Sequence, residues 1–147
     1  MTVEDALKDV TKLGIDTSPI IYFVQSHPTY DVVVSAIFHR IAAGPIEGIT
    51  STLTLTEILS WPIQQGNWQL LTQYRTLLTT SPHFTLVTID AAVAETAAHL
   101  RAKYRLRTPD ALQIGAALTT GCQAFLTNDK DLRRVTDLHI LLVDELL

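Results

Sequence analysis

Short apolar runs alternate with longer amphipathic segments along the whole chain. The short runs predict five strands, at residues 12–16, 46–52, 84–89, 123–127 and 139–143. Between them, apolar residues recur at helical spacing, for example Val33, Ile37 and Ile41 in a segment that Gly44 ends. Strands that alternate with helices predict an α/β fold with a mostly parallel sheet that helices cover on both faces.

Capping residues and prolines set the predicted helix boundaries. Thr2 with Asp5 resembles the cap of a short opening helix over residues 2–10. Ser18 before Pro19 predicts the start of a second helix, and Pro62 is expected to break the helix that contains residues 55–61. The other boundaries are predicted by Ser81-Pro82 after a helix at 67–80, by Asp90 before a helix at 91–104, and by Thr108-Pro109 before a helix at 110–120.

Length and composition bound the class of protein. A chain of 147 residues, 47% of them hydrophobic, fits one domain, 1–147, with an ordinary core. The single Cys122 cannot form an internal disulfide, which suits a reducing compartment. No apolar run is long enough to cross a bilayer, and the first ten residues lack the pattern of a secretory signal. We therefore expect a cytoplasmic protein with no membrane partner.

The net charge of −4, from 11 basic and 15 acidic side chains, argues against a general basic nucleic-acid binder. It leaves open a nuclease that brings protein and phosphate together through metal ions. Setting any four acids apart leaves 11 acidic against 11 basic residues. This balance raises the question whether four of the carboxylates form a separate group in the folded protein.

Four acids occupy comparable places in the predicted fold. Asp16 follows the first strand, Glu57 lies in the first turn of the helix after the second, Asp110 opens the helix at 110–120, and Asp129 follows the fourth strand. In open α/β sheets, sites form beyond the carboxyl ends of the strands. The positions therefore predict that Asp16, Glu57 and Asp129 lie at one end of the sheet, where Asp110 can join them.

Each of the four acids also has a purely structural interpretation. Asp16 could accept hydrogen bonds from the following turn, and Asp129 could cap a short helix over residues 130–135. Thr54 and Glu57 fit a capping box, and Asp110 suits the positive end of a helix dipole. Taken together, these separate interpretations leave the shared end of the sheet unexplained.

A converged set of carboxylates favours a hard divalent cation. Carboxylates packed together without a cation repel one another, and some would stay protonated. Mg²⁺ or Mn²⁺ takes oxygen ligands, keeps several waters and can activate one of them for attack on phosphorus. The five histidines show no paired spacing that would suit a softer metal.

Two other phosphate chemistries place an aspartate after a first strand. A haloacid dehalogenase-type phosphatase needs a second Asp two residues later, where this chain has Ser18. A receiver domain needs an acidic cluster ahead of its phosphorylated Asp, and residues 11–15 contain none. A non-catalytic binding module with structural acids remains the more serious alternative.

Four segments, "GIDTSPIIYF", "TSTLTLTEIL", "LRTPDALQIGAAL" and "AFLTNDKDL", resemble in this order the acidic blocks of PIN-domain nucleases. The subset that they resemble most is the VapC-type toxins, over residues 13–143. The resemblance implies a three-layer α/β/α sandwich with a central mostly parallel sheet. It also implies an Mg²⁺- or Mn²⁺-dependent endoribonuclease. Family members often begin at the first strand, so residues 1–12 are an N-terminal extension.

The resemblance assigns roles to individual residues. It makes Asp16, Glu57, Asp110 and Asp129 the catalytic and metal-binding quartet, with Asp16 and Asp110 as the best candidates for direct metal ligands. Thr17 and Thr127 match the polar residues that often accompany the first and fourth acids, and we expect them to support the site.

Basic residues flank the predicted site acids. Seven of the 11 basic residues lie in 101–107 and 130–134, and Arg107 and Lys130 are our candidates for binding the RNA backbone. Tyr22, Trp61 and Trp68 could stack on bases, although aromatic residues at helical spacing favour a place in the core or in an interface.

The resemblance also implies partners. VapC-type proteins form homodimers and are inhibited by a small antitoxin, so we expect an RNA substrate, a homodimer and an antitoxin protein. PIN domains also serve in RNA processing and decay, and the chain could belong to such a nuclease that is not a toxin.

Overall fold

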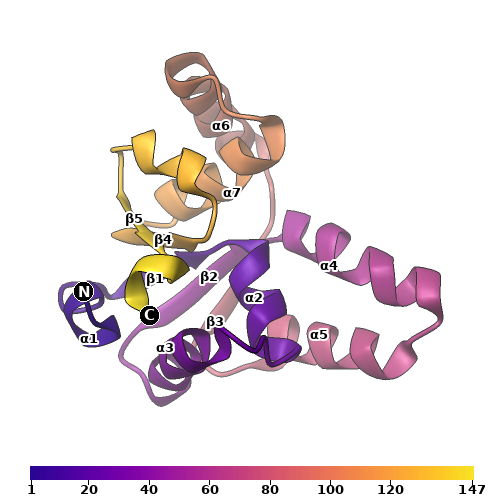
Figure 1. Cartoon of the computed structure of the whole chain (residues 1–147). Coiled ribbons are helices and arrows are strands. Elements are labelled where there is room, and N and C mark those ends of the chain that lie inside the picture. The colour runs from indigo at the N-terminus through magenta and orange to yellow at the C-terminus, as the bar shows by residue number, and fades with distance from the viewer.

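A five-stranded parallel sheet forms the centre of the computed structural model, which describes all 147 residues. The strands are β1 (Lys12–Ile15), β2 (Glu47–Ser51), β3 (Phe84–Val87), β4 (Ala124–Thr127) and β5 (His139–Leu142), in the order β3-β2-β1-β4-β5. All four pairings are parallel (Figure 1). The prediction of five strands in a mostly parallel sheet is confirmed.

Seven α-helices and two short 3₁₀ helices connect and follow the strands. They are α1 (Val3–Ala6), α2 (Thr17–Val24), α3 (Asp31–Ala43), α4 (Thr52–Gln65), α5 (Trp68–Thr80), α6 (Ala91–Tyr104), α7 (Thr108–Thr119), η1 (Lys130–Arg134) and η2 (Val143–Leu146). Helices α4 and α5 extend side by side away from the sheet (Figure 1). No helix is long and apolar enough to cross a membrane.

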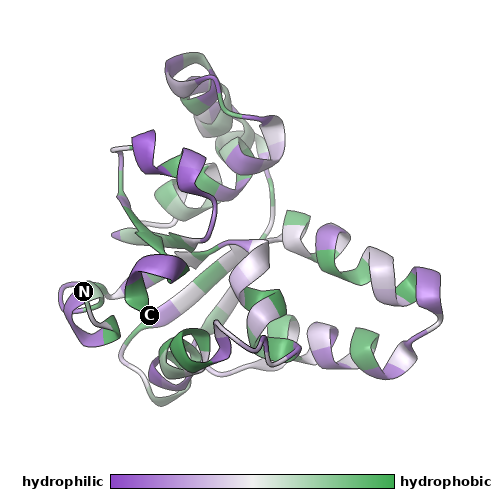
Figure 2. Cartoon of the chain, viewed as in Figure 1, coloured by the Kyte–Doolittle hydropathy of each residue, from purple (hydrophilic) through white to green (hydrophobic).

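Two hydrophobic clusters lie on opposite faces of the sheet. Leu13, Ile15 and Leu126 pack on one face with residues of α1 to α5. Phe125 packs on the other with residues of α6, α7 and η1. This alternation of neighbouring strand residues between faces is what the period of two predicts. The fold is therefore a three-layer α/β/α sandwich, and its helices carry hydrophobic and hydrophilic bands (Figure 2).

Helix α7 crosses the sheet unusually closely, because small residues line the contact. A Cβ atom at Gly14 of β1 would lie 2.8 Å from the Cβ atom of Ala117 on α7. On its other side, a Cβ atom at Gly115 of α7 would lie 3.1 Å from the carbonyl oxygen of Val93 on α6. These contacts fix the position of α7 and therefore of Asp110 in its first turn.

Several predicted helix boundaries are wrong, including that of α7, which begins at Thr108 and not after Pro109. The side chain of Asp16, and not that of Ser18, caps α2, so Thr17 is the first helical residue. Pro62 lies inside α4, which continues to Gln65 and ends at Gly66 in the left-handed conformation. The opening helix has the predicted capping box of Thr2 and Asp5 but spans only Val3–Ala6.

The extension at residues 1–12 packs on the body of the protein. Ala6 and Leu7 are buried in the cluster that contains α3. Where the extension meets β1, the side-chain oxygen of Gln123, which precedes β4, accepts hydrogen bonds from the backbone N–H groups of Thr11 (3.0 Å) and Lys12 (2.9 Å). The amino end of β1 is thereby tied to the amino end of β4.

Candidate active site

Asp16 lies where β1 ends and α2 begins, and both of its carboxylate oxygens are engaged. Oδ1 accepts a hydrogen bond from the backbone N–H of Thr17 at 2.8 Å, and Oδ2 accepts one from the hydroxyl of Thr127 at 2.8 Å. The backbone N–H of Asp16 donates to the carbonyl oxygen of Leu126 at 2.9 Å. Asp16 therefore continues the pairing of β1 with β4 while it caps the next helix.

Thr127 connects the first acid with the fourth. Its side chain is fully buried at the end of β4. Its hydroxyl donates to Asp16 and accepts a hydrogen bond from the backbone N–H of Asp129 at 3.1 Å. Asp129 Oδ1 accepts from the backbone N–H of Asp131 at 3.0 Å and caps η1, so its predicted structural role is observed. Its second oxygen, Oδ2, makes none of these bonds.

Asp110 stands in the first turn of α7, as predicted, and its side chain is only 15% exposed. Its Oδ2 accepts a hydrogen bond from Nε of Arg107 at 3.1 Å, and the Arg107 side chain is 76% exposed. The cation nearest to the acids is therefore an arginine from the same chain, held at the surface of the site.

Glu57 reaches the site from the second turn of α4, one turn later than predicted. Ser51 caps α4 by accepting from the N–H of Leu53, so the expected capping box of Thr54 and Glu57 does not form. Instead, Oε1 of Glu57 accepts a hydrogen bond from the hydroxyl of Thr17 at 2.7 Å. The purely structural interpretation of Glu57 as a helix cap is therefore wrong.

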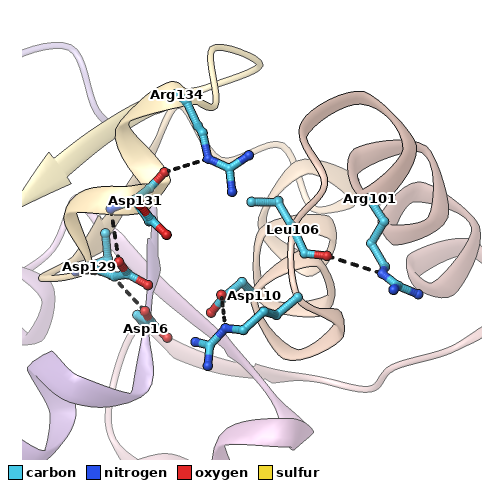
Figure 3. A network of polar contacts seen from close by, with 9 residues as sticks. Asp16, Arg101, Leu106, Asp110, Asp129, Asp131 and Arg134 are labelled. Carbon is cyan, nitrogen blue, oxygen red and sulfur yellow. Dashed lines mark hydrogen bonds and ion pairs between the residues drawn. The ribbon is translucent and has the colours of Figure 1, made fainter.

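The three aspartates converge on one space (Figure 3). Figure 3 shows Asp16, Asp110 and Asp129 pointing toward one another between α7 and the end of β4. The charges of Asp110, Asp129 and Asp16 together raise the pKa of Arg107, with the hydrogen bond to Asp110 as the largest cause. Glu57 is joined to this group from the other side by Thr17.

The environment of Asp16 disfavours its charged form. Burial raises the pKa of Asp16 from 3.8 to about 6. The hydrogen bonds from Thr127 and Thr17 act in the opposite direction, and the charges of Asp110 and Glu57 raise the pKa further. A positive charge placed beside Asp16 would remove this penalty.

A layer of buried hydroxyl and amide groups lies behind the acids, and the sequence predicts a supporting role at the site only for Thr17 among them. Its members, which come from β2, α2, α4 and α7, are Thr17, Thr50, Ser51, Thr54 and Gln113. They are joined by hydrogen bonds, and no buried side-chain polar atom lacks a partner. The available signal was the unusual number of hydroxyl residues in "TSTLTLTE" and the single amide in the apolar helix α7.

The donor set of the site suits a hard divalent cation, because it consists of carboxylate and hydroxyl oxygens without histidine or cysteine. As the side chains stand, no three acidic, histidine or cysteine residues have the geometry of a metal-binding group. Asp110 is engaged by Arg107 and Asp16 by Thr127. An ion bound between these acids would compete with Arg107 for the carboxylate of Asp110.

The predicted basic residues are partly engaged with acids of the fold. Lys130 lies 3.9 Å from Asp144, with its side chain 71% exposed. Arg133 pairs with Glu145. Arg101 Nε donates to the carbonyl oxygen of Leu106 at 3.3 Å. The pairs of Lys130 and Arg133 are exposed and contribute little to stability, whereas the partner of Arg107, Asp110, is largely buried.

Of the aromatic residues, the two tryptophans are on the surface and not in the core. Trp61 is 53% and Trp68 is 62% exposed. Trp61 and Glu57 line the same cavity of about 290 Å³ between α2, α4 and α5. Tyr22 packs its ring against those of His27 and Tyr30.

The sequence matches the model of the PIN domain family over residues 14–138. A parallel α/β/α sandwich with acids beyond its strand ends is the architecture observed, and this chain belongs to the PIN domain family. No protein with a curated description matches the sequence.

Solved structures of toxin–antitoxin proteins share the fold. A VapBC complex from Rickettsia felis bound to promoter DNA has a TM-score of 0.72 and 15% identity, covering 88% of this chain and 97% of that one. A DNA-bound VapBC from Salmonella typhimurium has a TM-score of 0.71 and 16% identity, covering 91% and 98%. A VapC toxin from Mycobacterium tuberculosis that cleaves the sarcin-ricin loop has a TM-score of 0.64 and 14% identity, covering 87% and 98%.

Proposed function

We propose that this protein is a metal-dependent endoribonuclease that hydrolyses phosphodiester bonds of RNA with Mg²⁺ or Mn²⁺. The observation that carries the proposal is the convergence of Asp16, Asp110 and Asp129, from three separate elements, in a chain of the PIN domain family. The choice of RNA is supported by the similarity to a toxin described as cleaving the sarcin-ricin loop.

Asp16 and Asp110 would hold the ion directly. Glu57 and Asp129 would complete the site as further ligands, as groups that orient those ligands, or as aids to water activation. An ion held there would make a bound water easier to ionise and would stabilise charge on the phosphate. Thr127 would keep Asp16 in place, since its hydroxyl already donates to Oδ2.

In the hydrolysis, the water oxygen forms a bond to phosphorus, the bond between phosphorus and O3′ breaks, and a proton ends on O3′. The products carry 5′-phosphate and 3′-hydroxyl ends. Glu57 and Asp129 are the candidates to take the proton that the water loses. Arg107 and Lys130, exposed at the rim, would bind the flanking phosphates.

Cleavage of a labelled RNA tests this proposal. The wild-type protein should cut RNA in Mn²⁺ or Mg²⁺, stop in EDTA and recover when Mn²⁺ is restored. Asp110→Asn should keep the fold and lose at least about a hundredfold in rate, because it removes one charged ligand. A folded wild-type protein that leaves every RNA intact with Mn²⁺ would instead indicate a non-catalytic binding module.

We also propose that the protein is the toxin of a toxin–antitoxin pair that acts in the cytoplasm as a homodimer. The support is its similarity to VapBC complexes and to a toxin–antitoxin complex from Klebsiella pneumoniae, at 20% identity and a TM-score of 0.66. Induced expression should arrest growth, and Asp16→Asn should abolish the arrest. Cleavage without growth arrest would favour a PIN nuclease of RNA processing or decay.

A further inference from the structure

Gln113 is a buried amide that none of the roles above uses. It is 4% exposed and lies one turn after Asp110 on α7, among the apolar residues Ala111, Ile114 and Ala117. Its Oε1 accepts a hydrogen bond from the hydroxyl of Ser51 at 2.7 Å. Its Nε2 donates to the hydroxyls of Thr54 at 2.7 Å and Thr17 at 3.3 Å.

The direction of these hydrogen bonds follows from counting protons, because each hydroxyl has only one to donate. The hydroxyl of Thr50 donates to the carbonyl oxygen of Ile15 at 2.9 Å. Thr54, 2.8 Å from Thr50, must therefore donate to it. The proton of Thr17 goes to Glu57, whose Oε1 is 2.7 Å away.

Only one orientation of the Gln113 amide satisfies this arrangement. With its oxygen and nitrogen exchanged, Oε1 would face Thr54 and Thr17, whose protons are already donated to Thr50 and Glu57. The amide nitrogen must therefore point at the two threonines. The result is a chain of donors that runs from Gln113 through Thr17 and ends at the carboxylate of Glu57.

The amide has a structural role, because its oxygen accepts the proton of the fully buried Ser51 hydroxyl. Burying an amide costs free energy unless every polar atom finds a partner, whereas an apolar side chain of similar shape has no such cost. The other buried residues of α7 on this face are small or aliphatic. Beyond its bonds to Ser51 and Thr54, the amide also gives the hydroxyl of Thr17 a fixed direction.

We propose that Gln113 is a positioning residue of the nuclease site, which holds the Thr17 hydroxyl with its proton directed at Glu57. This inference rests on the proposed function, because its consequence is a Glu57 carboxylate held in one orientation by the Thr17 hydroxyl. Without Gln113, Thr17 can donate to Thr54, 3.3 Å away, and Glu57 loses its only hydrogen-bond partner on the protein side.

Gln113→Met tests the proposal, since methionine fills a similar volume without polar atoms. We expect kcat for RNA to fall about tenfold with KM little changed, and the Kd for Mn²⁺, measured by calorimetry without RNA, to rise about tenfold. In a Thr17→Val background, which already lacks the hydroxyl, Gln113→Met should have no further effect on either quantity. Thr17→Ser, which keeps the hydroxyl, should remain close to wild type.

Gln123→Leu is the matched control. Gln123 is also an amide that joins distant segments, through Thr11 and Lys12, but at the amino ends of β1 and β4, at the opposite end of the strands from the site. The Gln123→Leu variant should have a lower unfolding temperature but an unchanged kcat and an unchanged Kd for Mn²⁺. If Gln113→Met does not fold, Ser51→Ala, which frees the amide oxygen, should change the same two quantities in the same direction but less.

The outcomes separate the two proposals. Unchanged kcat and unchanged Mn²⁺ affinity in a folded Gln113→Met protein would overturn the role of Gln113 while the nuclease stands. Equal losses in the wild-type and Thr17→Val backgrounds would also overturn it, because the effect would not pass through Thr17. A wild-type protein without RNA cleavage would remove the proposed function, and the Kd for Mn²⁺ would still decide the role of Gln113.

Discussion

At the scale of single residues, Asp16 is held in a conformation that opposes its charge. Two hydrogen bonds stabilise its carboxylate, yet burial still raises its pKa to about 6. The native state therefore binds a proton at Asp16 more tightly than the unfolded chain does, for which 3.8 is the ordinary value. Without a cation, the site lowers the stability of the fold.

The sign of the pH dependence follows from this shift. Between about pH 4 and pH 6 the native state holds more protons than the unfolded state, so the free energy of unfolding falls as pH rises. A shift of this size corresponds to about 3 kcal/mol as an upper limit. In EDTA, urea unfolding between pH 4.5 and 7.5 should show this loss for the wild type. Asp16→Asn should remove this component and be more stable at pH 7. An equal slope in both proteins would contradict the assignment.

Arg107 gives a second prediction at this scale. Because its guanidinium occupies the hydrogen-bonding position beside Asp110, it competes with an incoming cation. Arg107→Gln should therefore bind Mn²⁺ about threefold more tightly in calorimetry without RNA, a modest effect because the Arg107 side chain itself is largely exposed to solvent. The same variant should have a higher KM for RNA. Lys130→Gln, whose partner is Asp144, is the control and should leave Mn²⁺ affinity unchanged.

Single residues also show which features of the site could be predicted from the sequence and which could not. The four acids could be named because each follows a strand or opens a helix, positions that local pattern reveals. The link from Gln113 to Thr54 joins residues 59 positions apart, and nothing local in either segment indicates the other. Glu57 was placed one turn too early because "TSTLTLTE" offers several hydroxyl caps, and only the structure shows that Ser51 is the one used.

At the scale of elements, α7 carries both Asp110 and Gln113, and its position depends on its close packing against α6. The absence of a side chain at Gly115 lets the two helices approach, with the backbone of Val93 and Ala97 near its Cα. A larger residue would have to push backbone atoms, which cannot rotate away as a side chain can. The placement of two site residues therefore depends on Gly115 as well as on the contact of Gly14 with Ala117.

Gly115→Val should destabilise the protein by about 1–3 kcal/mol, as expected for overpacking a tight contact. It should also lower kcat, because the shift of α7 moves Asp110. Chemical denaturation and RNA cleavage on the same samples measure both effects. Ala98→Val, at an exposed position of α6, is the control and should cost less than about 1 kcal/mol with no change in kcat. A Gly115→Val protein as stable as the control would refute the packing argument.

The elements themselves were largely predictable, for a physical reason. Strands buried on both faces are continuous apolar runs, as in "AFL" of β4, and the helices have strong caps such as Asp90. Pro62 misled the prediction because it removes only one helical hydrogen bond, and α4 continues beyond it with Pro62 buried. Ser18 misled it because Asp16, two residues earlier, is also a strong cap.

At the scale of the whole molecule, the site is assembled from both faces of the sheet. Thr17 and Glu57 come from helices on one face, and Asp110 comes from α7 on the other. Asp16 and Thr127 belong to the strand ends between them. The acids therefore lie together only when the complete sandwich has formed, and an ion that they bind must stabilise the fold as a whole.

This coupling makes thermal unfolding a test of the site that is independent of any RNA. With Mn²⁺ at about 100 times its Kd, the wild-type protein should gain about 2.7 kcal/mol of stability, seen as a higher unfolding temperature. Asp16→Asn should start higher without metal, since its buried charge is gone, and should gain little when Mn²⁺ is added. The difference in unfolding temperature between the two proteins is therefore expected to become smaller or change sign as the Mn²⁺ concentration rises. An equal rise in both would mean that the ion binds elsewhere on the chain, and the acids at the strand ends would then need another explanation.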